Sequence, residues 1–257
     1  MLLSVICIAA VAVAALRIDD SGVARDEEIV ADLLDQTNAA FVVSAEELMD
    51  PIVLSSAEID TTIDRRAILS TLFERLTANA ATDTEKVEIW VRYLQDRVAH
   101  PRTCPLLENG QAIYDPLWIL ENRLGQCGQT NRVVVDGLLA AEFEARVVQL
   151  NRHVAAEVWL DGQWRYLDAN WLNLGQFVRK ADGSWPSAAE IHANPALVAN
   201  MRPGTEYALY AADVLGGAQG SYARAFEEEP YYYVKTATSE EEKNIYYGWN
   251  YYDTVTQ

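Results

Sequence analysis

The sequence predicts an α+β fold in which helices come first and an antiparallel β-meander follows. Apolar residues recur at helical spacing from Ala24 to about Ala141. From Glu144 onward the apolar residues alternate with a period of two, and Asp161-Gly162 separates the last two of these segments. An Asp-Gly pair between alternating segments is a strong signal for a two-residue β-hairpin turn. A run of helices followed by a run of strands is typical of the α+β class.

Five helices are expected before the strands, each with apolar residues on one face. Thr82 followed by Glu85 forms a capping box at the start of the third helix. Prolines make residues 100–116 loop-like, and Gly125 ends the fourth helix just before the fifth begins near Cys127. The expected segments are residues 24–36, 64–78, 82–98, 116–124 and 127–141.

Three strands are expected to form the meander. They are residues 144–150, 153–160 and 163–169. A two-residue turn at Asp161-Gly162 places Glu157 opposite Tyr166, with Asn170 opposite His153 and Asp168 diagonally across from His153. Diagonal Cβ atoms are roughly 7–8 Å apart, within reach of an imidazole–carboxylate hydrogen bond. The other face of the second strand is expected to be core, formed by Val154, Ala156, Val158 and Leu160.

The signal weakens after the meander. Residues 187–201 are expected to form two short helices broken at Pro195. Aromatic residues cluster at 231–233, 246–249 and 251–252. We expect these clusters to be strands that pack on the same sheet, and a stacking surface for sugars or a partner is the alternative.

The composition is that of an ordinary globular protein, and the charge is strongly acidic. Of the 257 residues, 50% are hydrophobic, and 38 acidic against 20 basic residues give a net charge of −18. So acidic a surface repels phosphate backbones and argues against nucleic acid as a partner. The expected organisation is an apolar leader (1–18), a helical N-terminal region (19–82), a catalytic core (83–175) and an aromatic-rich extension (176–257). The sequence predicts no oligomeric state.

Residues 1–16 form an uncharged apolar run. The run is shorter than the ~20 residues that cross a bilayer and fits the apolar core of a signal peptide, with Ala12-Val13-Ala14 as a cleavage candidate. No Lys or Arg precedes the run. We expect an exported protein that is periplasmic, secreted or attached to a membrane through this segment, and a buried first helix is the alternative.

The chain contains three cysteines, Cys7, Cys104 and Cys127. In an oxidising compartment Cys104 and Cys127 could pair, and such a disulfide would make the protein structural. There is no Cys-x-x-Cys pair and there are only three histidines, so we expect no zinc or other metal site and no cofactor.

Cys127 is expected to be a nucleophile. It lies between Gly125 and Gly128 at the start of a helix, where unpaired amides and the helix dipole favour a thiolate. The two glycines leave the backbone open to a substrate, and the Cys127 amide is a natural oxyanion donor. His153 is the candidate base, and a carboxylate such as Asp168 on one ring nitrogen would fix its tautomer. Asn170 is a second orienting candidate.

The segments "GQC", "FEARVVQL" and "RHVAAEVWLDGQW", followed by Asp168, resemble the transglutaminase-like superfamily over roughly residues 85–171. This resemblance implies a papain-like α+β fold with Cys127 as nucleophile, His153 as base and Asp168 as orienting carboxylate. The sequence departs from the family where an aromatic residue usually stands at Ala155 and a proline at Ala169.

The family often uses an upstream aromatic or glutamine side chain as a second oxyanion donor. Trp90 and Gln126 are the candidates in this sequence. Trp90 also lies at helical spacing with Val87, Val91 and Leu94, so a core position is its alternative role.

The expected function is cysteine-dependent acyl transfer on peptide or carboxamide bonds of a protein or peptide substrate, through a thioester. Hydrolysis by a protease or amidase is favoured over protein cross-linking by a transglutaminase, because the sequence lacks a calcium loop of the D-x-[DN]-x-[DN]-G type. A non-catalytic binding or scaffolding module on the same fold is the alternative from another class.

Overall fold

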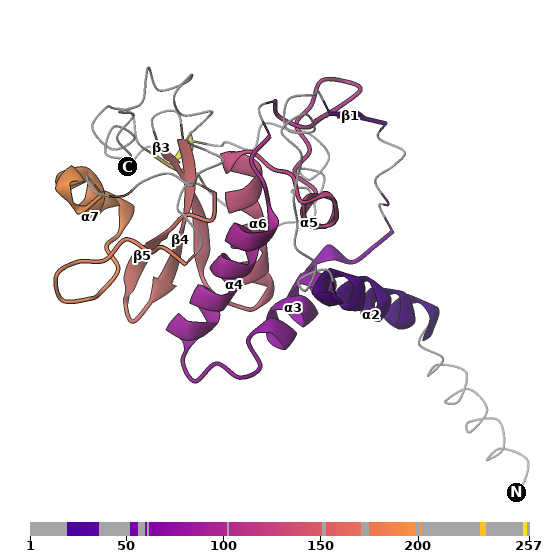
Figure 1. The fold of residues 1–257 in the computed structure, drawn as a ribbon, viewed down its shortest axis with the longest axis horizontal. Helices are drawn as coiled ribbons and strands as arrows, with labels where there is room; N and C mark the ends of the chain where they lie inside the picture. The colour runs from indigo at the N-terminus through magenta and orange to yellow at the C-terminus, as the bar shows by residue number, and fades with distance from the viewer. Residues whose placement is uncertain are drawn as a thin grey trace, which may run out of the picture.

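The computed structural model describes residues 20–35, 52–55, 60, 62–101, 103–150, 153–170, 175–198, 201, 232–234 and 254–255. The apolar run 1–16 and the aromatic clusters at 246–249 and 251–252 lie outside these ranges. Within them, no helix is both long enough and apolar enough to span a membrane. The described part is a set of helices packed beside an antiparallel sheet (Figure 1), so the predicted α+β class is confirmed.

Three helices open the described chain. They are α2 (Asp20–Asp35), α3 (Arg65–Leu76) and α4 (Asp83–Arg97). Asp64 caps α3 by accepting hydrogen bonds from the amides of its first turn, and Thr82 caps α4 by accepting from the Glu85 amide. The Glu85 carboxylate accepts from the Ala81 amide, one residue earlier than in the usual capping box. The predicted start of α4 is therefore confirmed.

Two further helices follow the loop, α5 (Pro116–Asn122) and α6 (Cys127–Ala140). Asp115 caps α5, and Arg123 ends it in the left-handed region with a φ of 59°. The loop before them contains a strand that the sequence did not predict. This strand, β2 (Leu106–Leu107), pairs in parallel with β1 (Val53–Leu54). Two-residue strands carry no alternation for sequence analysis to detect.

The meander has the predicted strands and register. It consists of β3 (Ala145–Leu150), β4 (His153–Leu160) and β5 (Gln163–Leu167). Glu157 lies opposite Tyr166, and both turn residues have positive φ, 52° at Asp161 and 75° at Gly162. Positive φ at both positions is the type I′ geometry that an Asp-Gly pair favours.

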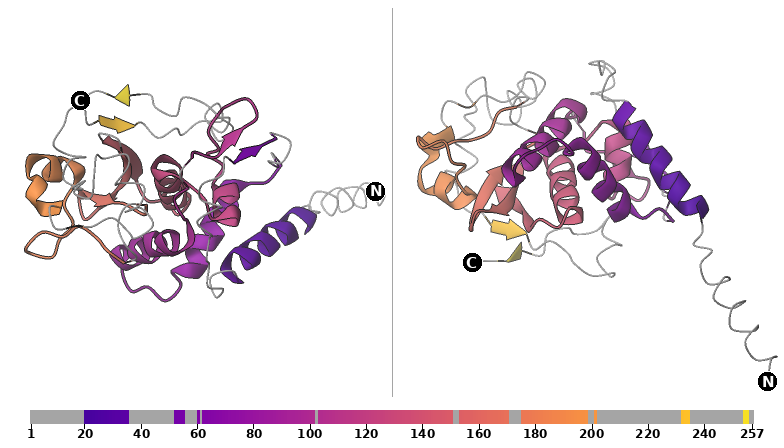
Figure 2. Two further views of the ribbon diagram at one scale, coloured as in Figure 1. Left: turned by 45° about the horizontal axis from the view of Figure 1, so that its top comes forward. Right: turned by 90° about the horizontal axis from the view of Figure 1, so that it is seen from below.

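Two short strands extend this sheet beyond β3. They are β6 (Tyr232–Val234), which pairs with β3, and β7 (Thr254–Val255), which pairs with β6. The sheet order is β5-β4-β3-β6-β7. Figure 2 shows these two strands along the far edge of the meander. The expectation that an aromatic segment near residue 232 joins the sheet is confirmed.

The meander lies between two helical layers (Figures 1 and 2). Helix α6 packs on the face that carries Val154, Ala156 and Val158. On the opposite side lie α7 (Ala188–Ala193) and a 3₁₀ turn (Pro195–Val198), as the break at Pro195 predicted. The face of β4 that carries His153 and Glu157 is therefore covered too, by α7.

Glu157 shows how this second face is closed. Its side chain is fully buried and accepts hydrogen bonds from the Arg146 guanidinium at 2.8 Å and from the Ala188 amide at 2.6 Å. Burial raises the pKa of Glu157, and the neighbouring Arg146 charge opposes this shift. The carboxylate thus holds the start of α7 against β4.

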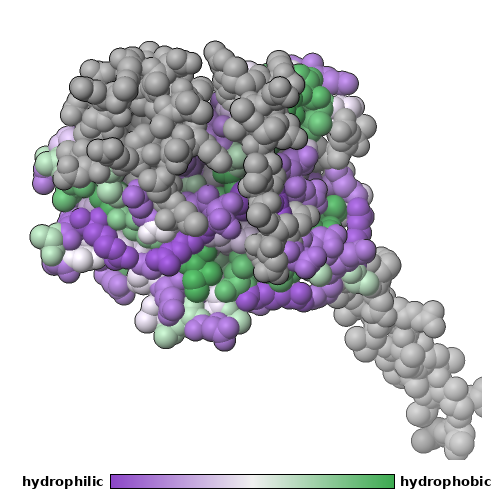
Figure 3. All heavy atoms as spheres, viewed as in Figure 1, coloured by the Kyte–Doolittle hydropathy of each residue, from purple (hydrophilic) through white to green (hydrophobic). Residues whose placement is uncertain are grey.

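Among the residues that are coloured in Figure 3, those at the surface are mostly hydrophilic, and hydrophobic residues form small separate groups.

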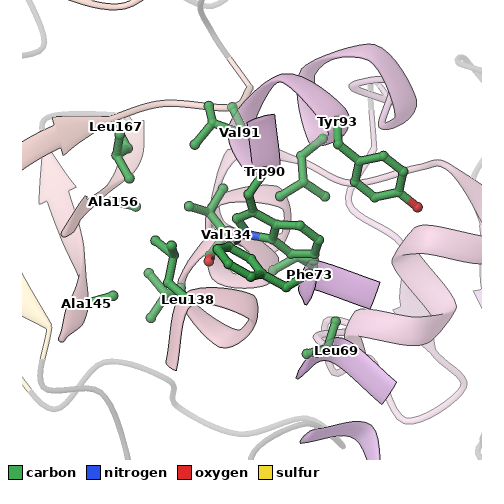
Figure 4. Close-up of a cluster of buried hydrophobic side chains, with 14 of the residues drawn as sticks. Leu69, Phe73, Trp90, Val91, Tyr93, Val134, Leu138, Ala145, Ala156 and Leu167 are labelled. Carbon is green, nitrogen blue, oxygen red and sulfur yellow. Dashed lines mark hydrogen bonds between the residues drawn. The ribbon is translucent and has the colours of Figure 1, made fainter. Parts of the chain in front are cut away.

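The hydrophobic core is centred on Trp90, between α6 and the helices before it (Figure 4). The Trp90 ring lies 5.8 Å from that of Phe73, centroid to centroid, and its Nε1 donates to the Val134 carbonyl at 3.1 Å. A Cβ at Gly137 would overlap the Trp90 ring. The indole therefore packs directly on the α6 backbone, and this contact explains a glycine within a helix.

Candidate active site

Cys127 is the first residue of α6, and the loop before it is tightly packed. A Cβ at Gly125 would lie 2.9 Å from Thr130 Oγ1 and 3.3 Å from Ile119 Cγ2. The absence of a side chain thus allows the loop to fold against the first turn of α6, which gives Gly125 a packing role. Cys127 as a whole residue is half-buried.

His153 and Asp168 form a buried pair beside this thiol. His153 Nε2 lies 2.7 Å from Asp168 Oδ2, and each residue is only 1% exposed. The diagonal arrangement across the hairpin is the one that the register predicted. Because Nε2 is engaged by the carboxylate, Nδ1 is the ring nitrogen left to interact with Cys127. The structure thus brings the three predicted residues together.

Asn131 joins α6 to both strands of the hairpin. One turn after the nucleophile, its Nδ2 donates to the Val154 carbonyl at 2.8 Å and to Asp168 Oδ1 at 3.1 Å. Its Oδ1 accepts from the Ala169 amide at 3.0 Å, a bond that a proline at 169 could not donate. Sequence analysis missed Asn131, because its spacing from Cys127 does not reveal what it meets across the fold.

Asn170 supports Asp168 and does not replace it as the partner of His153. The Asn170 amide donates to Asp168 Oδ1 at 2.9 Å. Its side-chain Nδ2 lies 3.3 Å from the Gly125 carbonyl and 3.4 Å from Thr130 Oγ1. Asn170 therefore links the end of the hairpin to the loop before Cys127, consistent with an orienting role.

A second histidine, His100, also lies close enough to the Cys127 thiol to lower its pKa, against the effect of burial. The chain just after α4 forms an isolated parallel bridge between Ala99 and Leu124, with the Gly125 amide donating to the Ala99 carbonyl at 3.0 Å. This bridge places His100 alongside the residues that lead into α6. Nothing in the sequence around His100 indicates this contact, because its partners lie in another element.

The two histidines explain an activated thiol. Burial disfavours the thiolate, but the hydrogen bonds and charges of His100 and His153 outweigh it and lower the pKa of Cys127 from 9.0 to about 6. Burial also disfavours imidazolium, but the charge and hydrogen bond of Asp168, followed by those of Cys127, raise the pKa of His153 from 6.5 to about 9. Between these values the pair exists as thiolate and imidazolium.

Both Cys104 and Cys127 are free thiols, so the alternative disulfide is not present in this structure. Burial, and then the negative charge of Cys127, raise the pKa of Cys104 to about 11. Cys104 should therefore stay protonated at neutral pH and be the less reactive of the two thiols. Among the residues that the structure describes, no group of three or more His, Cys, Asp or Glu is placed to hold a metal ion.

The structure does not bring Trp90 to the thiol. Its indole N–H is used on Val134, seven positions along α6 from Cys127 and thus about 10 Å away at a rise of about 1.5 Å per residue. Trp90 occupies the core position that was its alternative role. Gln126 precedes Cys127 directly, and the backbone amide of Gln126 donates to Gln129 Oε1 at 2.9 Å. A role for the Gln126 side chain as an oxyanion donor stays a prediction.

Comparisons with known proteins agree with this architecture. Residues 70–169 match the family model described as the transglutaminase-like superfamily. No curated protein matches the chain.

Several solved structures are similar to part of the chain. A protein from Parabacteroides distasonis, provisionally described as a protease, is 17% identical over 42% of this chain and 24% of its own, with a TM-score of 0.35. A protein from Cytophaga hutchinsonii, provisionally described as a cysteine protease, is 16% identical over 47% of this chain and 46% of its own, with a TM-score of 0.34. A structure described as a TGase is 16% identical over 62% of this chain and 41% of its own, with a TM-score of 0.36. The chain thus spans less than half the length of each.

Proposed function

We propose, given that residues 70–169 of this chain belong to the transglutaminase-like superfamily, that the protein is a hydrolytic cysteine acyl-transfer enzyme. Its substrates would be peptide or carboxamide bonds in a protein or peptide. The observation that carries the proposal is the buried His153–Asp168 hydrogen bond beside the thiol of Cys127, the first residue of α6. A nucleophile, a base and a group that orients the base are the requirements of covalent catalysis.

In the first half of the reaction, the Cys127 thiolate attacks the substrate carbonyl carbon and forms a C–S bond. The negative charge moves from sulfur to the carbonyl oxygen, where the Cys127 amide in the unpaired first turn of α6 is suited to stabilise it. Imidazolium His153 then donates its Nδ1 proton to the amine nitrogen, and the C–N bond breaks. The amine leaves, and a thioester and a neutral imidazole remain.

In the second half, an acceptor attacks the thioester. For hydrolysis, His153 takes a proton from water as the oxygen adds to the carbonyl carbon, the C–S bond breaks, and thiolate and imidazolium are restored. An amine acceptor would instead give an isopeptide or substituted amide, the cross-linking alternative. Hydrolysis is favoured because the sequence contains no calcium loop of the D-x-[DN]-x-[DN]-G type.

The experiment compares the two acceptors directly. The purified chain is incubated with an unfolded protein substrate, with and without a fluorescent primary amine, and the products are identified by mass spectrometry. Hydrolysis predicts new peptide termini or deamidated side chains, and these must be absent with Cys127→Ala. Incorporation of the amine in place of water would indicate a transglutaminase. If neither product forms, and if an activated ester also fails to acylate Cys127, the result would support the binding-module alternative.

Export, with residues 1–16 as a cleaved signal or membrane anchor, is also proposed. A C-terminally tagged chain should then be found outside the cytoplasm, and the mass of its N-terminal peptide distinguishes a cleaved signal from an anchor. Retention of the uncleaved chain in the soluble cytoplasmic fraction would contradict export.

A further inference from the structure

His100 and His153 reach the same sulfur from different parts of the fold. His153 comes from β4, and its ring is held by Asp168. His100 follows the Ala99–Leu124 bridge, and is 8% exposed. The bridge is built from two backbone hydrogen bonds, from Ala99 to the Arg123 carbonyl at 2.8 Å and from Gly125 to the Ala99 carbonyl at 3.0 Å. These backbone bonds, which lie outside the hairpin, help to place His100 beside Cys127.

The ionisable groups that face the Cys127 sulfur come from three segments. They are His100 after α4, His153 on β4 and the neutral Cys104 in the loop before β2, with Asp168 behind His153. Both imidazoles lie close enough to the thiol to lower its pKa, against the effect of burial. Because only His153 is needed to shuttle the proton between thiol, leaving amine and water, the acyl-transfer chemistry leaves the His100 contact without a role.

We propose that His100 is a second catalytic imidazole, which donates a hydrogen bond to the Cys127 sulfur and stabilises the thiolate independently of the His153–Asp168 pair. This inference rests on the proposed function only in identifying Cys127 as the nucleophile. A ring N–H held at the sulfur stabilises the charge of the resting enzyme. This charge leaves the sulfur when the C–S bond forms.

This placement gives His100 a recognisable kinetic signature. An interaction that is stronger in the resting thiolate than in the transition state increases the fraction of reactive enzyme at low pH and does not accelerate the attack itself. A less stabilised thiolate is also intrinsically more nucleophilic. Loss of His100 should therefore raise the pH at which the thiolate forms, and the reaction rate at high pH should stay the same or increase.

The test is the rate of Cys127 alkylation by iodoacetamide against pH, with the adduct mapped by mass spectrometry. His100→Phe keeps the ring and removes the donor, and His100→Gln restores an N–H. We expect His100→Phe to move the midpoint upward by about one pH unit, which is roughly a tenfold loss of rate below the midpoint, with no loss on the plateau. His100→Gln should return the midpoint most of the way.

Two further variants test independence from His153. With His153→Phe alone, the alkylation midpoint should remain below 9.0, the ordinary pKa of the thiol, because His100 is still present. The double variant should have its midpoint at or above that value. Thermal melting of each variant confirms that it is folded.

Three outcomes would overturn the proposal. An unchanged midpoint in His100→Phe means that the imidazole does not act on the thiolate. A plateau that falls with no shift of the midpoint means that His100 affects access to the sulfur or the local packing and not the stability of the thiolate. A His100→Gln variant that melts normally but behaves like His100→Phe removes the N–H as the cause. None of these outcomes touches the proposed function, which fails separately if wild-type Cys127 is unreactive.

Discussion

The two ends of helix α6 are held in opposite ways. Near its start, polar side chains bond to other elements: Gln129 donates to the Ile113 carbonyl and Asn131 donates to Asp168. Two turns later the helix packs mainly through apolar contact, with Val134 and Gly137 against the ring of Trp90 (Figure 4). One continuous helix therefore carries the candidate nucleophile at its start and is anchored to the core by its remainder.

This difference predicts how substitutions should divide. Changes in the first turn remove specific partners, so they should lower activity more than stability. Changes in the later turns alter packing volume, so they should lower the free energy of unfolding and leave the chemistry of the surviving folded protein intact.

The largest expected effect is that of Cys127→Ala. Removal of the nucleophile should reduce kcat by a factor on the order of 10⁶, as in other enzymes with covalent catalysis, with little change in melting temperature. Cys104→Ala is the matched control, because Cys104 is the neighbouring thiol and stays protonated. Steady-state hydrolysis of an activated ester or peptide substrate measures both. Equal loss of activity in the two variants would contradict this division of roles.

Asp168→Asn should have the next largest effect. One oxygen of the Asp168 carboxylate accepts from His153, and the other accepts from Asn131 and Asn170. The side chain of an asparagine at 168 would have to point its NH₂ group at one of these donors, and that hydrogen bond would be lost. Loss of the Asp168 charge also lowers the pKa of His153, so that imidazolium is lost at lower pH. We expect kcat to fall by roughly 10⁴, as in other triads with this change. The alkaline limb of the activity profile should move to lower pH, and an unmoved limb would contradict the assignment.

Asn131→Ala tests the hydrogen bonds that join the start of α6 to the β4–β5 hairpin. It leaves the Ala169 amide and the Val154 carbonyl without their side-chain partner, at a cost of about 1–3 kcal/mol for each group that stays buried. It also frees Asp168 to rotate, so kcat should fall while KM changes little. Denaturant unfolding and kinetics on the same sample measure the two effects. Lost stability with unchanged kcat would make Asn131 a purely structural residue.

Gly137→Ala belongs to the packing half of the helix. The added methyl group overlaps the Trp90 ring, and overpacking of this kind costs about 1–3 kcal/mol. The reactivity of Cys127 should not change. Trp90→Phe in the same chain should recover part of the loss, because the two sites are in contact and their effects are not additive. Additive losses would show that the strain is not between these residues.

The sequence predicted the parts of the fold and site that depend on local pattern. The hairpin register follows from Asp161-Gly162 alone, and it placed Asp168 within reach of His153. Cys127 at the start of a helix was also visible as a local signal. The catalytic roles of these three residues stay predictions until activity is measured.

The sequence could not predict contacts between distant elements. His100 lies near the thiol because the preceding residue, Ala99, forms a parallel bridge with Leu124. Asn131 donates to Asp168 across the helix–sheet interface. Neither contact has a periodicity or motif. The buried Glu157 is a similar case, since its burial depends on where the short helix α7 lies. Side chains of these types are usually exposed, so only the fold identifies them as buried partners.

The most direct test of the central claim, that Cys127 is an activated nucleophile, is the pH dependence of its alkylation in the wild-type protein. Thiolate forms as the pH rises through the pKa of Cys127, so the labelling rate should be half-maximal at a pH of about 6. It should remain fast through neutral pH, while His153 is still protonated below about 9. A midpoint near 9.0, the ordinary value for a cysteine thiol, would contradict the account.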